Sequence, residues 1–334
     1  MLFIIGNGFD IARGLKTSYK NFLDWYLFQN EDNAPQSVIK LKNAIRRDVE
    51  IDIDSWADLE IKLGMYTKEY DDNEVGDFII AYRNIKNKLD EYIKAEEANV
   101  NTTKIVSVSN EFLKFIVGVP GYLPRGYSDS LEDIFNPRDR AVIYNFINFN
   151  YTNTLKRCLR ENSEVCKRTI AGDVHKDCVG EIVHVHGMVG DYPLLGVDNV
   201  RQVIRESFLT NEELKGLLIK PYINDISDKY EVKRAKELID ESELICFYGV
   251  SLGDSDISWW VIIGEWLKAQ PSRKIVIFKY YEGLLAERWD VTNVIDKTRK
   301  HFAAKAGLSD KEYDNQKHKI LVYPYKNIVT HKLV

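Results

Sequence analysis

Short apolar segments and longer amphipathic segments alternate along the chain. Residues 1–5 are apolar and run directly into Gly6-Asn7-Gly8, which predicts a buried strand that ends in a tight turn. Other short segments, rich in β-branched and aromatic residues, predict strands at 142–149, 181–185, 243–248, 274–278 and 319–322. Apolar residues at helical spacing predict helices between most of them, at 152–160, 228–240, 257–268 and within 284–306. This alternation indicates an α/β protein with a mainly parallel sheet and helices on both faces.

The stretch between the first two predicted strands has a helical pattern. Thr17 and Ser18 precede a segment with helical spacing and can cap its first turn. A second start signal lies at Asp54-Ser55, where residues 55–58 fit a capping box. From 54 to 118 the pattern stays helical and gives no strand signal. We therefore expect a helical insertion or cap at 54–118, within one α/β domain that spans residues 1–334.

Composition and charge narrow the class of protein. The chain has 334 residues, of which 45% are hydrophobic, a share that can form a sizeable core. Acidic and basic residues are mixed and the net charge is -5, so we do not expect nucleic acid as a partner. No apolar run approaches the roughly 18 residues of a membrane helix, and the run before Gly6 is too short for a signal peptide. Four cysteines in a chain of this length indicate reduced thiols, as expected of a cytoplasmic protein without a membrane partner.

Candidate chemistry lies at the carboxyl ends of the predicted strands, where parallel sheets bind ligands. The first candidate segment consists of Gly6, Asn7, Gly8, Phe9 and Asp10. Its glycines allow the backbone to approach a pyrophosphate and to direct N–H groups toward it. The segment is neither a P-loop, because no Gly-Lys-Ser/Thr follows, nor a complete dinucleotide fingerprint, because the third glycine is missing. A tight turn without a ligand is an equal alternative.

Two further strand ends carry polar residues that suit catalysis. Asn150 follows a strand and is either a ligand contact or the N-cap of the next helix. His184 and His186 alternate on one strand, which places both on the same face. For His186 a general base and a hydrogen-bonded core histidine are equal alternatives. A metal site is disfavoured, because the nearby cysteines and histidines match no common zinc spacing.

The segment 249–253, Gly-Val-Ser-Leu-Gly, has the form of a nucleophile elbow and suggests a rival function. Ser251 would be the nucleophile of a serine hydrolase, and an acid and a histidine would follow it. The chain offers these partners downstream as Asp290 or Asp296 with His301 or His318. Against this function, no glycine-rich oxyanion segment follows an upstream strand. Asp254 and Asp256 would also oppose the negative charge that develops on an oxyanion.

In their order along the chain these motifs resemble the sirtuin-like NAD-binding domains. More closely, they resemble the abortive-infection AbiH family of bacterial phage-defence proteins. The segments that carry this resemblance are IIGNGFDIARGLKTSYKNFL, SWADLE, NFNYTNTL, HVHG and FYGVSLGDSD, between residue 2 and about residue 260. The resemblance implies a Rossmann-like, sirtuin-like sheet and a role in phage defence.

The resemblance also implies a role for each motif. The segment from Gly6 to Asp10 would contact NAD, with Gly6 and Gly8 at the pyrophosphate. Gly249, Ser251 and Asp254 would line the adenosine side. Asn150 would lie beside the nicotinamide ribose, and His186 would act as the base. The implied reaction is hydrolysis of NAD to nicotinamide and ADP-ribose.

Several positions depart from the related patterns. Sirtuins have Asp where Thr152 stands and Ser where Asp10 stands, and Val250 replaces a histidine of the AbiH pattern. The sirtuin zinc ribbon is also missing, so protein deacetylation is not implied. These departures support the alternative of a nucleotide sensor or scaffold without catalytic activity. The partners that the resemblance allows are a phage-derived trigger and a second copy of the chain. The resemblance places Asp58 and Glu60 near the pocket, although the start of a predicted helix is by itself favourable for carboxylates.

Overall fold

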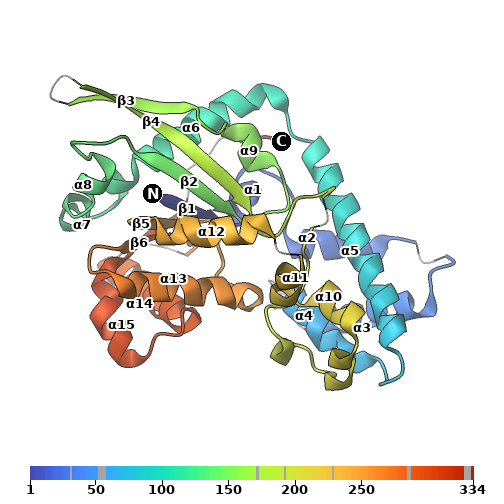
Figure 1. Ribbon diagram of the computed structural model, residues 1–334. Coiled ribbons are helices and arrows are strands. Elements are labelled where there is room, and N and C mark those ends of the chain that lie inside the picture. The colour runs from blue at the N-terminus through green and yellow to red at the C-terminus, as the bar shows by residue number, and fades with distance from the viewer. Residues whose placement is uncertain are drawn as a thin grey trace.

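One seven-stranded sheet forms the centre of the protein (Figure 1). The computed structural model describes residues 1–30, 32–51, 58–170, 173–191, 193–227, 229–283, 287–326 and 332–334. The strands are β1 (Leu2–Ile5), β2 (Ile143–Asn148), β3 (Glu164–Ile170), β4 (Asp173–His184), β5 (Leu244–Tyr248), β6 (Lys274–Tyr280) and β7 (Ile320–Tyr325). Their order is β3-β4-β2-β1-β5-β6-β7, and every neighbouring pair is parallel except β3 with β4. The predicted α/β class with a mainly parallel sheet is confirmed.

The six strands expected from the sequence are present, but the sequence pattern does not predict β3. Its segment, EVCKRTI, pairs antiparallel with the first part of β4, and both are rich in charged residues. Polar contacts hold this ribbon: the Arg168 guanidinium donates to both carboxylate oxygens of Asp177 at 2.8 Å and to the Pro137 carbonyl at 2.8 Å. The strand was missed because apolar periodicity reports burial, and this ribbon depends on a charge pair instead.

Helices cover both faces of the sheet, as the alternation in β1 requires. Phe3 and Ile5 belong to the apolar core on one face, and Leu2 and Ile4 to the core on the other, and all four are fully buried. The first face is covered by α6 (Ile105–Val117) and α9 (Thr154–Cys158). The second is covered by α12 (Tyr230–Asp240), α13 (Ile257–Ala269) and α14 (Arg288–Lys305). Four shorter helices complete the described part: α1 (Gly8–Ala12), α7 (Arg125–Asp129), α8 (Glu132–Phe135) and α15 (Asp310–Gln316).

A separate group of helices, here called the helical lobe, lies beside the sheet (Figure 1). It consists of α2 (Tyr19–Phe28), α3 (Gln36–Ile51), α4 (Leu59–Tyr66), α5 (Val75–Ala98), α10 (Glu212–Leu218) and α11 (Lys220–Ile226). These helices enclose an apolar core of their own. The lobe therefore differs from the insertion expected at 54–118: α2, α3, α10 and α11 join it, whereas α6 packs on the sheet. The described residues between β1 and β2 contain helices and turns but no strand.

The start signals of two lobe helices have different outcomes. Ser18 is the N-cap of α2, and its hydroxyl accepts a hydrogen bond from Asn21 N at 3.1 Å. The capping box expected at 55–58 includes residues 55–57, which lie outside the described residues. Asp58 is itself the N-cap of α4 and accepts from Ile61 N at 3.2 Å.

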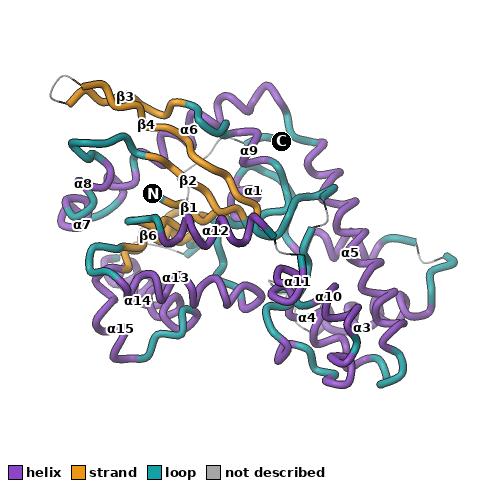
Figure 2. Tube along the Cα trace, viewed as in Figure 1, coloured by secondary structure: helices purple, strands orange, loops and turns teal. Residues whose placement is uncertain are grey.

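The strand order reverses at β1, and the edge of the sheet at which the strands around this reversal end faces the helical lobe. The chain passes from β1 to β2 on one side and later to β5 on the other, so the loops after these strands leave at the same edge (Figure 2). Open α/β sheets bind ligands in the crevice at such a reversal.

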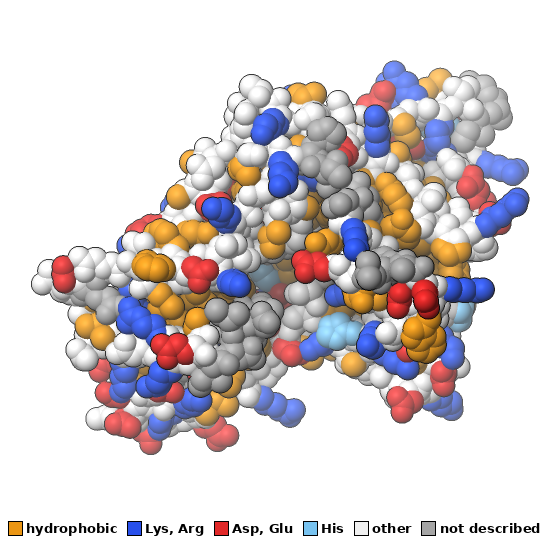
Figure 3. All heavy atoms as spheres, turned by 180° about the vertical axis from the view of Figure 1, so that it is seen from behind, with side chains coloured by type: hydrophobic (Ala, Val, Ile, Leu, Met, Phe, Trp, Pro, Cys, Tyr) orange, Lys and Arg blue, Asp and Glu red, His pale blue; other side chains and the backbone are white. Residues whose placement is uncertain are grey.

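Charged side chains of both signs are distributed over one face of the molecule. On the face opposite to that of Figure 1, acidic and basic side chains are interspersed rather than gathered by sign (Figure 3). Among the residues described, no helix combines the length and apolar character that crossing a bilayer requires.

Candidate functional site

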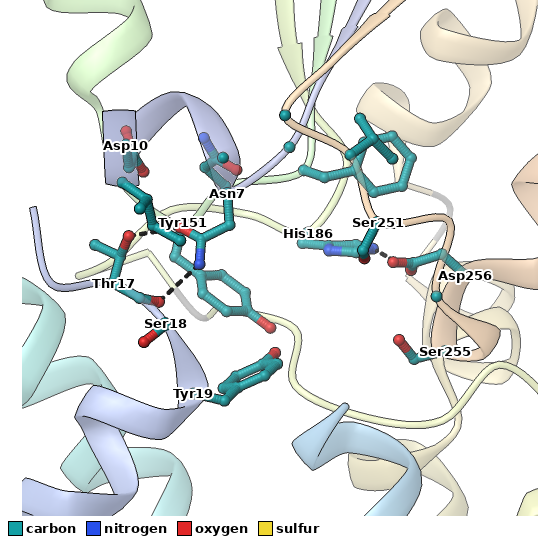
Figure 4. Close-up of a pocket in the computed structure, with 18 of the residues that line it drawn as sticks. Asn7, Asp10, Thr17, Ser18, Tyr19, Tyr151, His186, Ser251, Ser255 and Asp256 are labelled. Atoms are coloured by element: carbon teal, nitrogen blue, oxygen red, sulfur yellow. Dashed lines mark hydrogen bonds and ion pairs between the residues drawn. The ribbon is translucent and has the colours of Figure 1, made fainter. Parts of the chain in front are cut away.

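A cavity of about 430 Å³ lies at this edge of the sheet, between the strand ends and the helical lobe (Figure 4). It brings together residues that follow four different strands. Of the predicted site residues, its lining includes Gly6, Asn7, Gly8, Asp10, Asn150, His186, Gly249 and Ser251. The lobe contributes Asp58 and Glu60. The four motifs singled out from the sequence therefore meet in space, although Gly6 and Ser251 are 245 positions apart in the chain.

Two predicted ligand contacts, Phe9 and Asp254, are not among the residues that line the cavity. Phe9 is fully buried and packs edge-on against Phe112, with 5.0 Å between the ring centroids. Asp254 forms an ion pair with Lys305 of α14. Phe9 does not line the cavity because its ring is buried in the core, and Asp254 does not line it because its carboxylate pairs with Lys305.

The glycines of the two loops have a packing role of their own. A Cβ atom on Gly8 would lie 2.5 Å from Gly249 Cα, and Gly249 has a φ of +70°, a conformation that other residues rarely adopt. The loops are also hydrogen-bonded, because Gly8 N donates to Gly249 O at 2.8 Å and Gly6 N to Tyr248 O at 3.1 Å. Phe9 N donates to Gly6 O at 2.9 Å. The glycines thus bring two loops together, and a phosphate contact at this point stays a prediction.

Asn7 holds the neighbouring loop in place. Its Nδ2 donates to Thr17 O at 2.8 Å, and its Oδ1 accepts from Thr17 Oγ1 at 2.5 Å. This pair fixes the segment that leads into α2. The N-cap Ser18 and the first residue of α2, Tyr19, also line the cavity (Figure 4).

His186 is held on one side by a carboxylate. Its Nε2 lies 2.9 Å from Asp256 Oδ1, in the 3-10 turn Asp254–Asp256 that follows β5 (Figure 4). The ring also packs edge-on against Phe149, with 5.1 Å between centroids. By contrast, His184 Nδ1 lies 3.3 Å from Asn150 O, and burial lowers the pKa of His184 to about 4, which keeps it neutral. Only His186 of these two histidines lines the cavity.

A buried lysine completes this arrangement, and the sequence interpretation missed it. Lys220, the first residue of α11, has its Nζ 2.9 Å from Glu60 Oε2, 2.9 Å from Asp256 Oδ1 and 3.0 Å from Ser255 O. Burial alone would lower the pKa of Lys220, but the two carboxylates raise it above its ordinary value. Burial opposes ionisation of Asp256 too, yet His186 and Lys220 hold the pKa of its carboxyl below its usual range. The one sequence signal that could have indicated Lys220 is its place at the end of an apolar run, directly before Pro221.

Two buried polar side chains of the cavity lack partners for some of their atoms. Asn150 is 4% exposed, and neither its Nδ2 nor its Oδ1 has a hydrogen-bond partner among the described residues. Asp10 is fully buried; its Oδ2 accepts from Thr152 Oγ1 at 2.7 Å, whereas Oδ1 has no partner there. Burial raises the pKa of Asp10 to about 7. Because buried polar atoms are nearly always hydrogen-bonded, these atoms are available to bond a ligand or a water molecule in the cavity.

The alternative that Asn150 caps a helix is wrong. β2 ends at Asn148, α9 begins at Thr154, and the N-cap position belongs to Asn153.

The loop around Ser251 lacks the geometry of a nucleophile elbow. In such an elbow the serine itself sits on a strained turn, but here the residues with positive φ are Gly249 and Leu252. The two candidate acids have other partners: Asp290 closes the first turn of α14, and Asp296 lies 2.8 Å from a lysine on the next turn. Within the described part of the chain, no group of three or more His, Cys, Asp or Glu side chains is placed to hold a metal ion.

Comparisons with known proteins bear on the same segments. A family model described as "Bacteriophage abortive infection AbiH" matches residues 2–278, a range that includes every residue of the cavity lining. The comparison with curated proteins gives no match.

Proposed function

This chain belongs to the AbiH family of bacteriophage abortive-infection proteins, and we propose that it binds NAD or a related nucleotide in the cavity and hydrolyses its nicotinamide–ribose bond. The observation that carries this proposal is Asn150, a buried amide whose side-chain atoms have no hydrogen-bond partner among the described residues and which lines the cavity together with His186. An amide offers both donors and an acceptor, so it suits the hydroxyls of a ribose or the carboxamide of nicotinamide.

The reaction requires little acid catalysis. The bond between C1′ and the pyridinium nitrogen breaks, its electron pair stays on that nitrogen, and nicotinamide leaves as a neutral molecule. The ribose passes through an oxocarbenium-like state, a water oxygen bonds to C1′, and the proton of that water goes to His186. The products are nicotinamide, ADP-ribose and a proton, which balances the charge of the cationic ring.

The charges around the cavity favour this chemistry. Asp58, Glu60 and Asp256 line it, and positive charge that develops on the ribose is stabilised by nearby carboxylates. Asp10 lines the same cavity, and its Oδ1, which has no partner among the described residues, would accept a hydrogen bond from a ribose hydroxyl. Because the N–H groups of Gly6 and Gly8 already donate to protein carbonyls, we assign the diphosphate to the exposed Lys20, which also lines the cavity, and not to the glycines.

Nicotinamide release from NAD by the purified protein tests the proposal, measured beside Asn150→Ala, His186→Ala and a control, Asp296→Asn. Asp296 lies in α14 and is not among the residues that line the cavity. We expect the control to match the wild type and the His186 variant to lose about 10²- to 10⁴-fold in rate, the usual contribution of a general base.

Three outcomes separate the alternatives. Release that disappears in both cavity variants, with unchanged melting temperatures, supports hydrolysis. A thermal shift by NAD without release supports a nucleotide sensor. Neither release nor thermal shift contradicts NAD as the ligand.

A further inference from the structure

Four charged or titratable side chains meet at the cavity wall, and they come from four different parts of the chain. Glu60 belongs to α4, Lys220 to α11, Asp256 to the turn after β5, and His186 follows β4. Three of them form a continuous row of short contacts, with 2.9 Å between Lys220 and Asp256 and 2.9 Å between Asp256 and His186 (Figure 4 shows the second contact).

We propose that Lys220 and Asp256 are positioning residues that hold the His186 imidazole with one nitrogen bound and the other directed to the reaction, and this inference rests on the proposed function. The 2.9 Å between His186 Nε2 and Asp256 Oδ1 is short enough for the carboxylate to accept the proton of Nε2, which in this proposal leaves Nδ1 as the basic nitrogen. In a neutral imidazole the partner of one nitrogen decides which of the two carries the proton.

Lys220 fixes Asp256 because it has no rotational freedom left. An ammonium group has three N–H donors, and the Lys220 Nζ has three acceptors within 3.0 Å: Glu60, Asp256 and the carbonyl of Ser255. The lysine side chain is 4% exposed and that of Glu60 is 5% exposed. Water therefore cannot replace either contact without opening the core between the lobe and the sheet.

Stability alone does not account for such a cluster. Transferring a charged side chain from water into the protein interior costs several kcal/mol per ion. Apolar residues of similar volume often stabilise a protein as much as such a buried ion pair does. Burial raises the pKa of Glu60, whereas His186 and Lys220 hold the pKa of Asp256 below its usual range, so Asp256 is the carboxylate that carries negative charge beside His186. That charge stabilises the imidazolium that forms when His186 accepts a proton, as an aspartate does in a catalytic triad.

Other titratable groups that face the cluster set its pH response. Asp58 Oδ2 lies 3.4 Å from Ser255 N, and Asp198 accepts from the Ser258 hydroxyl at 2.6 Å. Tyr151 contacts Glu60 Oε1 through its hydroxyl at 3.3 Å, and Tyr19 is hydrogen-bonded to Tyr151. Burial raises the pKa of both carboxyl groups and of both phenols.

The test compares Asp256→Asn and the double variant Glu60→Gln/Lys220→Met with the wild type. The double variant removes one negative and one positive charge, and we therefore expect it to fold. Lys220→Met alone would leave two buried carboxylates without their cation. Lys319→Met is the matched control. Lys319 is 3% exposed, as is Lys220, but it donates to the carbonyls of Leu267 and Gln270 outside the cavity lining.

The first readout does not depend on activity: the imidazole ¹⁵N signals of His186. We expect a wild-type spectrum of the tautomer protonated at Nε2, and a mixture of tautomers in Asp256→Asn and in the double variant. Lys319→Met loses stability but keeps the wild-type His186 signals. Wild-type signals in a folded double variant would overturn the role of Lys220, and protonation at Nδ1 in the wild type would overturn that of Asp256.

The second readout is the kinetics of nicotinamide release. We expect kcat to fall about 10²-fold in both cluster variants with little change in KM, because misplacing a base affects the chemical step more than binding. A wild type that does not release nicotinamide contradicts the proposed function, while the ¹⁵N spectra still decide the positioning of His186.

Discussion

Replacing Asp10 by Asn is expected to stabilise the protein at pH 8 and to weaken its ligand binding. Asp10 lies directly after the first glycine loop, fully buried, with one carboxylate oxygen bonded to Thr152 and the other without a partner among the described residues. Asn keeps the shape and an acceptor for the Thr152 hydroxyl, but it carries no charge at any pH. The variant therefore isolates the cost of burying a carboxylate.

The pKa of Asp10 gives the size of the effect. Its ordinary value of 3.8 applies to the unfolded chain, and burial raises it to about 7 in the folded protein. The folded state therefore binds more protons between these values, and stability falls as the pH rises from about 4 to 7. Each pH unit in that window costs about 1.4 kcal/mol, so the carboxylate costs about 4 kcal/mol at pH 8. Between pH 5 and pH 8 the difference between variant and wild type should grow by about 3 kcal/mol.

Urea denaturation of both proteins at pH 5 and at pH 8 measures this difference. We expect the variant to gain on the wild type as the pH rises, and to show a smaller thermal shift with NAD. If the two proteins differ by the same free energy at both pH values, Asp10 does not change its ionisation on folding and the reasoning is refuted. In that case the hydrogen bond from Thr152 and the nearby Arg13, which both favour the charged form of Asp10, offset the burial.

Three other predictions follow from single contacts. Gly249→Ala should destabilise the protein by more than about 1 kcal/mol and lower its melting temperature, because φ is +70° and the new Cβ would lie 2.6 Å from Phe9 N. Tyr82→Phe should cost about 1–3 kcal/mol in urea denaturation, since the buried Tyr82 hydroxyl donates to Leu195 O at 2.5 Å. A fluorophosphonate probe should not label the protein, because Ser251 lacks the backbone of an elbow; labelling that disappears in Ser251→Ala would instead restore the serine hydrolase.

Much of the sheet follows from local patterns in the sequence. Six strands are present where short apolar segments predict them, because a strand that is buried on both faces must be apolar along its length. The same reasoning failed for β3, which is held by the pair of Arg168 and Asp177 and carries little apolar signal. The extent of the helical lobe was also beyond the sequence, since α10 and α11 join it from a distant part of the chain.

The candidate site divides in a similar way. Gly6, Gly8, Asn150, His186 and Ser251 could be selected because each stands at a predicted strand end, and parallel strands carry their ligands there. Phe9 and Asp254 were selected by the same rule, but neither is part of the lining. Position in a loop indicates which residues can reach a ligand, whereas side-chain direction depends on what packs beneath the loop.

The sequence by itself determined the alternation of strands and helices and the segments at the strand ends, because both depend on burial and backbone conformation within a few residues. Only the tertiary structure decided that Lys220 and Glu60 stand behind His186. Their contacts join residues 160 positions apart in the chain, and no periodicity connects them. A buried lysine is recognisable as functional only when the carboxylates that keep it charged are in place around it.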